Sequence, residues 1–304
     1  QLTIGFIKPY KTTYFNKNNP ENTYGGSEEN VNLMKIFASH GHQIKILSKT
    51  DYDGSIQNIE IGNTESDIDI LLMSNGVFSK NEYSEKFILH QYQYIKKILL
   101  ETDLDLSLNC HNLNLYDLIL SQSKTMDTRK YAHLEKLIAY QHQIYNNDFN
   151  SRIHDGIFIG NERDRSKKFK EYVVDTNIYF RGKSETYKID KKANRQELTK
   201  LLKKYIYSPV FSGDEQNKNG FVSQRYFENC LHGIINFIDT DFNKNELIIK
   251  HNDLRRVKDG NDLLNKSTRL DYSLFKILQN NQFQEIKQWI DGEKLYNHIY
   301  NLIK

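Results

Sequence analysis

The chain has few of the residues from which covalent or metal scaffolds are built. Its 304 residues include 2 Cys, 3 Pro and 1 Trp. Cys110 and Cys230 are far apart and lack metal-ligand spacing, which argues against a disulfide framework and against a zinc site. Internal repeats and low-complexity tracts are also absent from the sequence. The remaining composition is that of a globular protein long enough for two domains.

Long apolar runs are missing too. No run approaches the roughly 20 residues that a membrane-spanning helix needs, and the mean hydropathy is −0.71. The first residues, QLTIGFIKPY, lack the basic-then-apolar layout of a signal peptide and predict a strand instead. We therefore expect a cytoplasmic protein with no membrane partner, and a monomer as the default.

The formal net charge of +3 hides an asymmetry between the two halves of the chain. Residues 1–150 contain 14 Lys and Arg against 18 Asp and Glu, whereas the remainder contains 28 against 21. A basic second half is compatible with phosphate ligands or nucleic acid, although a solvated basic helix face is the more common meaning.

Alternating strands and helices predict an α/β fold with parallel sheets covered on both faces. In the first half we expect strands at Leu2–Ile7, Gln43–Leu47, Ile68–Met73 and Ile98–Leu100, and helices at Asn30–His40, Phe87–Ile98 and Leu118–Asn146. In the second half we expect strands at Gly156–Ile159, Asn177–Phe180, Val210–Phe211 and Ile234–Ile238, and helices at Arg165–Val173, Gln196–Tyr205 and Gln224–Leu231.

The polar, turn-rich segment Asn146–Arg152 marks the predicted domain boundary. We predict two Rossmann-like, doubly wound domains at residues 1–150 and 151–283, facing each other across a cleft. Ligands of such sheets bind beyond the carboxyl ends of the strands. A last helix, Gln284–Ile303 within residues 284–304, is free to pack anywhere, including back on the first domain.

The most informative stretch is residues 220–239, GFVSQRYFENCLHGIINFID. Arg225 and Glu228 are three apart on a predicted helix and therefore share a face. A guanidinium suits a diphosphate and a carboxylate suits the hydroxyls of a ribose. An ordinary ion pair on a solvated helix has the same spacing, so both interpretations stay open.

Two loops at predicted strand ends add to this pattern. Gly160 opens the sequence GNERDR, in which a glycine turn, helix amides and the arginines Arg163 and Arg165 predict a diphosphate cradle. Gly213 and Asp214 form a loop beside the Arg225 helix and are placed to contact ribose or phosphate. Neither loop has a specific nucleotide signature. Arginines that neutralise acidic neighbours, and plain surface turns, look the same.

The first half offers residues for a sugar and for proton transfer. Gly26, Ser27 and Glu28 open the first predicted helix, where backbone amides and a carboxylate are placed to bind sugar hydroxyls. The alternative is helix capping by Ser27. Asp103 follows a predicted strand end, the usual place of a catalytic general base in such a sheet. Glu101 and Asp105 are rivals on the same side, and a capping or solvent-exposed role fits as well.

Taken in order, these segments resemble the DNA β-glucosyltransferases of T-even bacteriophages, which are inverting GT-B enzymes. The resemblance is carried by FSGDEQNKNGFVSQRYFENCLHGIINFIDTDF, KILLETDLDLSL, GGSEENVNLMKIFASHGH and FIGNERDRSKKF. The family transfers glucose from UDP-glucose to 5-hydroxymethylcytosine in duplex DNA.

The resemblance implies a role for each residue that matches the family's motifs. It implies Asp103 as the general base and Glu28 as a glucose contact. The residues implied at the UDP are Gly160, Arg163, Arg165, Ile189, Gly213, Asp214, Arg225 and Glu228. Within that set Ile189 would meet the uracil through its backbone. Asn161 stands where the family has a phosphate-loop serine, and the two arginines are closer together here.

The resemblance also implies partners and a mechanism. We expect a UDP-sugar donor, duplex DNA with modified bases flipped from the stack, and a divalent cation, Mg²⁺ or Mn²⁺, at the diphosphate. Retaining relatives often carry two acids eight residues apart, but Gly220 lies eight residues before Glu228, which favours inversion. A GT-B enzyme for a glycan, lipid or protein acceptor, and a non-catalytic DNA-binding relic, are the alternatives.

Overall fold

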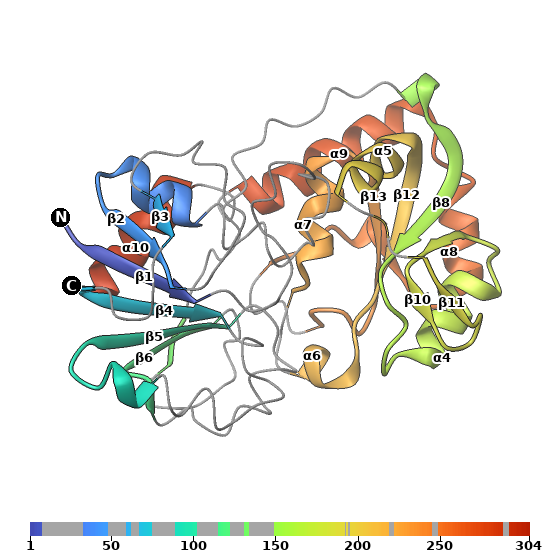
Figure 1. The fold of residues 1–304 in the computed structure, drawn as a ribbon. Coiled ribbons are helices and arrows are strands. Elements are labelled where there is room, and N and C mark those ends of the chain that lie inside the picture. The colour runs from blue at the N-terminus through green and yellow to red at the C-terminus, as the bar shows by residue number, and fades with distance from the viewer. Residues whose placement is uncertain are drawn as a thin grey trace. The chain divides into compact units, whose positions relative to one another are not determined.

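The computed structural model describes residues 1–7, 33–47, 59–61, 67–74, 89–101, 115–121, 131–133, 149–191, 193, 195–218, 222–244, 249–287 and 292–304. The chain forms two units (Figure 1). The first comprises Gln1–Gln141 together with Trp289–Lys304, and the second comprises His142–Gln288. The functions we predict for the two domains stay predictions.

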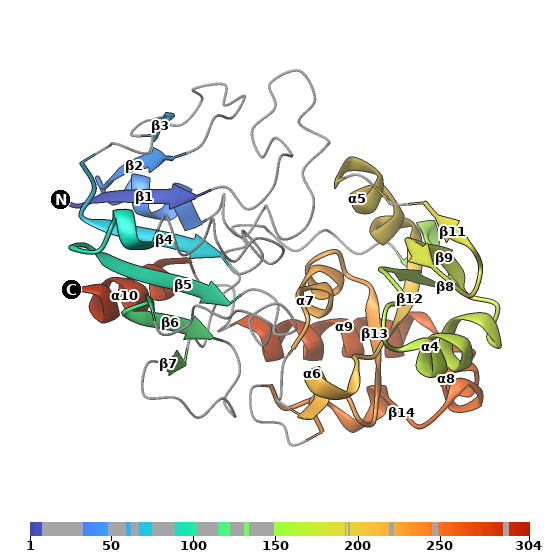
Figure 2. The ribbon, with the colours of Figure 1, turned by 60° about the horizontal axis from the view of Figure 1, so that its bottom comes forward.

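The first unit is built on a parallel sheet with the strand order β3-β2-β1-β4-β5-β6-β7 (Figure 2). Its strands are β1 (Thr3–Ile7), β2 (Gln43–Ile46), β3 (Ile59–Ile61), β4 (Ile70–Ser74), β5 (Lys96–Glu101), β6 (Leu118–Ser121) and β7 (Tyr131–His133). Residues 33–39 are helical. Apolar runs such as that of β4 bury both faces of a strand, as parallel sheets covered by helices require.

A helix from the far end of the chain completes the first unit. Helix α10 (Gly292–Ile303) places the Tyr296 hydroxyl 2.8 Å from Nε2 of His42, and the Tyr296 ring stacks on His40 with centroids 3.6 Å apart. Lys96 Nζ donates to the Ile303 carbonyl at 2.9 Å. Residues about 200 or more positions apart therefore share one core.

The second unit has a parallel sheet with the order β14-β13-β12-β8-β9 and a separate β10-β11 hairpin. The strands are β8 (Ile153–Ile159), β9 (Tyr179–Arg181), β10 (Lys183–Ser184), β11 (Ile189–Asp190), β12 (Tyr205–Val210), β13 (Ile235–Asp239) and β14 (Arg256–Val257). The helices are η3 (Phe149–Ser151), α4 (Ser166–Phe169), η4 (Lys170–Val174), α5 (Arg195–Lys204), α6 (Asp214–Lys218), α7 (Gln224–Leu231), η5 (Asp253–Arg255), α8 (Gly260–Ser267) and α9 (Tyr272–Ile286).

Side-chain alternation along β8 gives this sheet an apolar layer on each face. Phe158 packs in a cluster with Phe169, Phe211 and residues of α9, whereas Ile157 and Ile159 pack in another cluster with residues of α5. The predicted doubly wound fold class is therefore what both units have.

Three predicted elements are wrong. Residues 96–98 of the predicted helix Phe87–Ile98 belong to β5, and the predicted helix Leu118–Asn146 contains β6 and β7. Short buried apolar runs fit helix and strand equally well, which is why periodicity failed there. The predicted helix Gln284–Ile303 is two helices, α9 and α10, with α10 in the first unit.

A fourth error is the length of the central strand. We predicted a strand at Val210–Phe211 after a helix ending at Tyr205, but β12 starts at Tyr205 and ends at Val210. It contains Pro209, which cannot donate to a ladder and normally argues against a central strand.

No helix within the described residues is long and apolar enough to cross a bilayer.

Candidate functional site

Several loops of the second unit meet at one edge of its sheet. Strands β8, β9, β12 and β13 run parallel, so their carboxyl ends lie on the same side. The loop Gly160–Arg165 follows β8, the β10-β11 hairpin follows β9, and residues 211–214 follow β12. This is the edge at which doubly wound sheets bind ligands, and the predicted residues Gly160, Arg163, Arg165, Gly213 and Asp214 lie in these loops.

Arg165 joins two of these loops. Its Nη2 donates to the Asn161 carbonyl at 2.8 Å, and its Nη1 donates to the Phe211 carbonyl at 2.9 Å. The guanidinium also lies over the rings of Phe158 and Phe211, at 5.7 and 5.4 Å from their centroids. Arg165 thus holds the loop after β8 against the end of β12. It does not neutralise an acidic neighbour through these contacts.

Asp164 and Gly213 bring the same loops together from the other side. A Cβ added to Gly213 would lie 2.4 Å from Oδ2 of Asp164, so only a glycine lets the carboxylate take this place. The next residue, Asp214, is exposed and begins α6. The structure therefore places the predicted Gly160 and Gly213 loops in contact.

Arg163 differs from Arg165 in exposure and backbone. Its side chain is exposed, and its φ of 48° lies in the left-handed region. That conformation costs a non-glycine residue about 1–2 kcal/mol, and such outliers cluster at ligand-binding positions. Arg163 is the arginine of this loop that is best placed to reach a ligand in solution.

Glu162, which the sequence did not single out, lies directly before Arg163 and is buried, at 1% exposure. Its carboxylate accepts hydrogen bonds from Ser184 Oγ at 2.6 Å, Thr186 N at 3.0 Å and Thr186 Oγ1 at 2.5 Å. Burial alone would raise the pKa of Glu162, but these hydrogen bonds and one from Ser166 lower it to about 2. Its partners are 22 and 24 residues further along the chain, and no local pattern announces them.

Ile189, the predicted uracil contact, lies in β11 and pairs with Ser184 of β10. The hairpin backbone is tied to the loop after β8, because Glu162 N donates to the Lys183 carbonyl at 2.9 Å and Lys183 N donates to Asn161 Oδ1 at 3.1 Å. The structure thus places the backbone of Ile189 in a hairpin that is hydrogen-bonded to the Gly160–Arg165 loop.

Arg225 and Glu228 form an ion pair on α7, with Arg225 Nη1 2.5 Å from Glu228 Oε2. The Glu228 side chain is 2% exposed and the Arg225 side chain 29% exposed. A solvated surface pair would expose both, so this part of the alternative interpretation is wrong. Burying a carboxylate away from water is costly unless the carboxylate is paired with a cation. Arg225 is the cation that pairs with Glu228.

Helix α7 rests on a buried polar network. The Tyr226 hydroxyl donates to Glu285 Oε2 at 2.7 Å, and the fully buried Arg255 pairs with the same carboxylate. Burial raises the pKa of Tyr226 well above its usual value, while burial, His251 and Arg255 together leave the pKa of Glu285 at about 2. This network fixes the inner side of α7 at Tyr226, the residue that follows Arg225.

Asp239, at the end of β13, is occupied by internal partners. Lys168 Nζ donates to Asp239 Oδ2 at 2.7 Å, and the Tyr172 hydroxyl donates to the same oxygen at 2.5 Å. Burial and the neighbouring carboxylate raise the pKa of Tyr172. These contacts give Asp239 a structural role.

The predicted sugar and catalytic residues lie outside the described residues. These are Gly26, Ser27, Glu28 and Asp103; Asp103 comes two residues after the end of β5 at Glu101. Within the part of the chain that the structure describes, no group of three or more His, Cys, Asp or Glu is arranged to hold a metal ion. The divalent cation stays a prediction.

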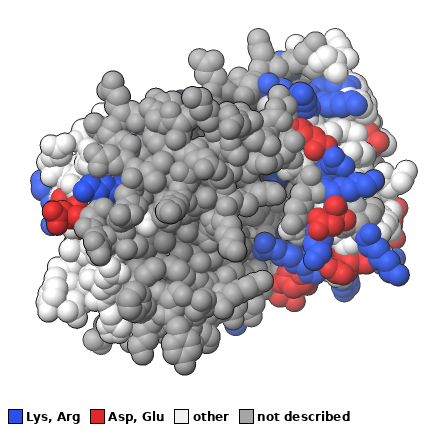
Figure 3. Space-filling view, viewed as in Figure 1, with Lys and Arg blue, Asp and Glu red and all other residues white. Residues whose placement is uncertain are grey.

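On the face shown in Figure 3, Lys and Arg of the second unit alternate with Asp and Glu. Charges of mixed sign are typical of a solvated protein surface.

Comparisons with known proteins identify the fold. By sequence, no protein-family model and no curated protein matches the chain. By structure, the chain is similar to T4 phage BGT in complex with its UDP-glucose substrate, with a TM-score of 0.73, 18% identity and 100% of both chains covered.

Two further glycosyltransferases match at lower TM-scores. AviGT4, involved in avilamycin A biosynthesis, has a TM-score of 0.58 at 10% identity over 99% of this chain and 96% of its own. Anabaena Alr3699/HepE in complex with UDP-glucose has a TM-score of 0.57 at 11% identity over 100% and 99%. The chain has the GT-B glycosyltransferase fold, as predicted.

Proposed function

We propose that the chain is a UDP-sugar-dependent glycosyltransferase whose second unit binds the nucleotide. The observation that carries the proposal is the convergence of the Gly160–Arg165 loop, the Gly213 loop and the β10-β11 hairpin at one edge of the sheet. Backbone amides, an exposed Arg163 and the Arg225–Glu228 pair on α7 are the groups that diphosphate and ribose require. The likeness to two structures solved with UDP-glucose supports this donor.

The finer proposal concerns the acceptor and the reaction. We assign the acceptor to a hydroxymethylated base in duplex DNA, with 5-hydroxymethylcytosine as the first choice. Asp103 takes the proton of the hydroxymethyl group, whose oxygen attacks the anomeric carbon of the sugar from the face opposite UDP. The bond between that carbon and the diphosphate oxygen breaks, UDP leaves, and the configuration inverts. Arg225 and Arg163 stabilise the charge that develops on the diphosphate.

The DNA acceptor rests on the resemblance to the phage DNA β-glucosyltransferases and on the full-length likeness to T4 phage BGT. The target base must leave the stack to react, and lysines and arginines would hold the DNA phosphates without reading sequence. Binding should therefore weaken as salt concentration rises.

A second candidate acceptor is a glycan or other small molecule. AviGT4 and HepE match almost the whole chain, although their TM-scores of 0.58 and 0.57 are lower than 0.73. This candidate shares the donor site and predicts no affinity for DNA.

A transfer assay, together with a measurement of UDP binding, separates these proposals. Radiolabelled UDP-glucose is incubated with duplex DNA that contains 5-hydroxymethylcytosine and, in parallel, with the same duplex unmodified. We expect label on the modified duplex alone. UDP binding without label on DNA would overturn the DNA acceptor and keep the donor site, whereas absence of UDP binding would overturn the glycosyltransferase itself.

A further inference from the structure

Glu162 is the one acid of the phosphate loop that is fully withdrawn from solvent. It is 1% exposed, while its neighbours Arg163 and Asp164 are exposed. A buried carboxylate is retained only where hydrogen bonds replace its water. Here three of the replacing donors come from one element, the β10-β11 hairpin, and Ser166 of α4 supplies another.

The Glu162 carboxylate, which belongs to the loop after β8, caps the turn of the β10-β11 hairpin. One oxygen accepts from Ser184 Oγ and from Thr186 N, and the other accepts from Thr186 Oγ1. Ser184 Oγ in turn accepts from Tyr187 N at 3.0 Å. The backbone groups that the turn would otherwise leave unpaired are thus satisfied through Glu162.

Backbone contacts hold the same two elements in register. Gly160 N donates to the Arg181 carbonyl at 3.0 Å, and a Cβ on Gly182 would fall 1.8 Å from the Gly160 oxygen. Gly182 also has a φ of 152°, so the close approach requires a glycine there. The loop after β8 therefore continues along the strand that leads into the hairpin.

The contact between Glu162 and Ser184 lies next to the predicted base contact, Ile189. Ser184, which donates to Glu162, is paired in register with Ile189. Movement of Ser184 away from Glu162 would move the backbone of Ile189 with it. Conversely, the hairpin is fixed relative to Arg163, the residue that follows Glu162.

We propose that Glu162 is a positioning residue for base specificity: it locks the β10-β11 hairpin onto the phosphate loop, so that base recognition and diphosphate binding belong to one rigid element. The inference deepens the proposed function and rests on it, because the hairpin reads a uracil only if the second unit binds UDP. Rigid placement lowers the ordering cost of binding and lets a backbone group discriminate between bases.

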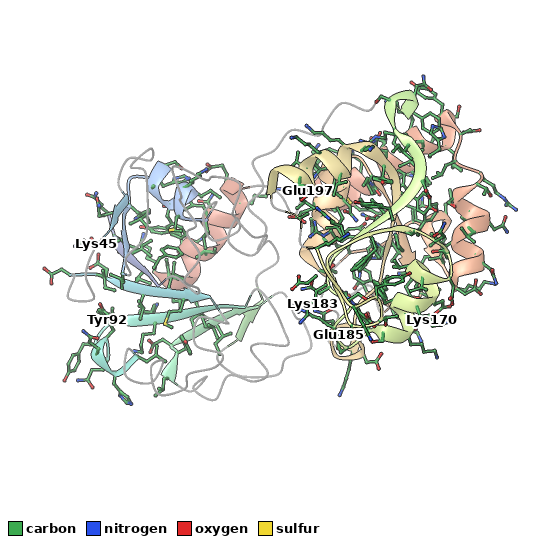
Figure 4. All side chains as sticks on the ribbon, turned by 45° about the vertical axis from the view of Figure 1, so that its right-hand side comes forward. Lys45, Tyr92, Lys170, Lys183, Glu185 and Glu197 are labelled. Carbon is green, nitrogen blue, oxygen red and sulfur yellow. The ribbon has the colours of Figure 1, made fainter. Side chains whose placement is uncertain are left out.

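The test compares nucleotide selectivity in matched variants. Glu162→Gln removes the charge and keeps the size. Glu185→Gln makes the same change at an exposed position of the same hairpin, where the Glu185 side chain is 81% exposed and 3.4 Å from Lys183 Nζ (Figure 4). The dissociation constants of UDP and ADP are measured by calorimetry for wild type and both variants.

We expect Glu162→Gln to weaken UDP binding about tenfold or more, as loss of a charged hydrogen bond does, and to leave ADP binding within about threefold. The UDP preference then falls toward one, while Glu185→Gln behaves like wild type. A purely structural role would weaken UDP and ADP by the same factor, and that result would overturn the proposal. Unchanged UDP binding in Glu162→Gln would overturn it as well.

Two arrangements keep the result interpretable. If Glu162→Gln does not fold, Thr186→Val removes one donor from the hairpin side and is held to the same criterion. If wild type itself shows no preference for UDP over ADP, the proposed function fails and this inference fails with it. If wild type prefers UDP and the variants keep that preference, the inference alone is wrong.

Discussion

The two units share a plan, a parallel sheet between helices, but their described interiors differ. In the first unit the buried polar side chains among the described residues are His42 and Lys97. In the second unit they include the charged residues Glu162, Glu228, Asp239 and Arg255, and Arg255 pairs with the partly exposed Glu285. Among the residues that the structure describes, the first unit thus packs with few buried polar side chains and the second with paired buried charges.

This difference has a physical reason in the position of the charges. Glu162 holds the hairpin, Asp239 ends β13, and the Arg255–Glu285 pair supports α7. Apolar packing is non-directional, whereas hydrogen-bonded charges fix loops in one geometry. We infer that the second unit is organised to bind a ligand without rearrangement, and that its polar residues couple stability to binding.

The largest expected effect separates the units by function. Asp103→Asn, in the first unit, should lower sugar transfer by about 10²–10⁴, the usual contribution of a general base. UDP affinity, measured by calorimetry, should stay unchanged. If transfer survives, Glu101 or Asp105 becomes the base, and weaker UDP binding would contradict the division of labour.

The next prediction breaks the buried pair of the second unit. Arg255→Met should lower the free energy of unfolding by about 3–5 kcal/mol, because it leaves the Glu285 carboxylate without its cation. Urea denaturation measures the loss. The matched control in the first unit is Ile98→Val, which should cost about 0.5–1.5 kcal/mol. Equal losses would contradict the contrast between the interiors, and adding Glu285→Leu to Arg255→Met should restore much of the stability.

Acid should affect the second unit through Glu162 and Glu285. Their folded pKa values of about 2 lie below the ordinary 4.5, so each stabilises the fold above pH 4.5, and that contribution is lost as the pH falls from about 4.5 to about 2. A shift of this size corresponds to about 3 kcal/mol per group.

Hydrogen exchange at pH 6 and pH 3 measures the acid effect separately in each unit. In the first unit, burial and the nearby N-terminus lower the pKa of His42. The contribution of neutral His42 to the free energy of unfolding is therefore lost as the pH falls below 6.5. Glu162→Gln should flatten the response of the second unit below pH 4.5. A second unit whose protection is equal at both pH values would contradict the assignment.

A smaller effect is expected at the nucleotide contacts on α7. Arg225→Gln and Glu228→Gln should each weaken UDP binding about tenfold to a hundredfold, as loss of a charged hydrogen bond predicts. Lys200→Gln, an exposed cation on α5, serves as the control. Unchanged UDP affinity in both variants would contradict the prediction that α7 contacts the nucleotide.

The smallest prediction concerns Ser212, at the end of β12. It is 3% exposed, and its hydroxyl has no hydrogen-bond partner in the portion of the chain described. Ser212→Ala should raise the free energy of unfolding by about 1 kcal/mol, because the desolvated hydroxyl is removed. Native proteins keep such groups where strain, an ordered water, an ion or a ligand accounts for them, and if Ser212 contacts UDP its loss should weaken UDP binding about threefold. Higher stability with unchanged UDP affinity would exclude Ser212 from the site.

Sequence patterns predicted what depends on neighbouring residues. The helix Gln224–Leu231 has the predicted bounds because its apolar residues recur at helical spacing. The Gly160, Gly213 and Arg225 segments could be predicted as candidate nucleotide contacts because each follows a predicted strand or loop along the chain. Burial of Glu228 was not predictable from three-residue spacing, which is identical for a surface pair.

What remained hidden depends on residues far apart in the chain. Arg165 was expected at the diphosphate, but its contact with the Phe211 carbonyl spans 46 positions. The partners of Glu162 lie 22 and 24 positions away, and a Glu followed by Arg163 and Asp164 looks like a surface charge. Only the parallel order of β8, β9 and β12 brings these residues together.

The packing of α10 on the first unit has a consequence for how the protein is made. A ribosome releases the chain from the amino end, yet His42 and Tyr296 lie 254 positions apart. The second unit is therefore fully synthesised before the first can acquire its last helix. During translation the surface of the first unit that α10 covers stays exposed until the end of the chain is made, and chaperones can bind it in that interval.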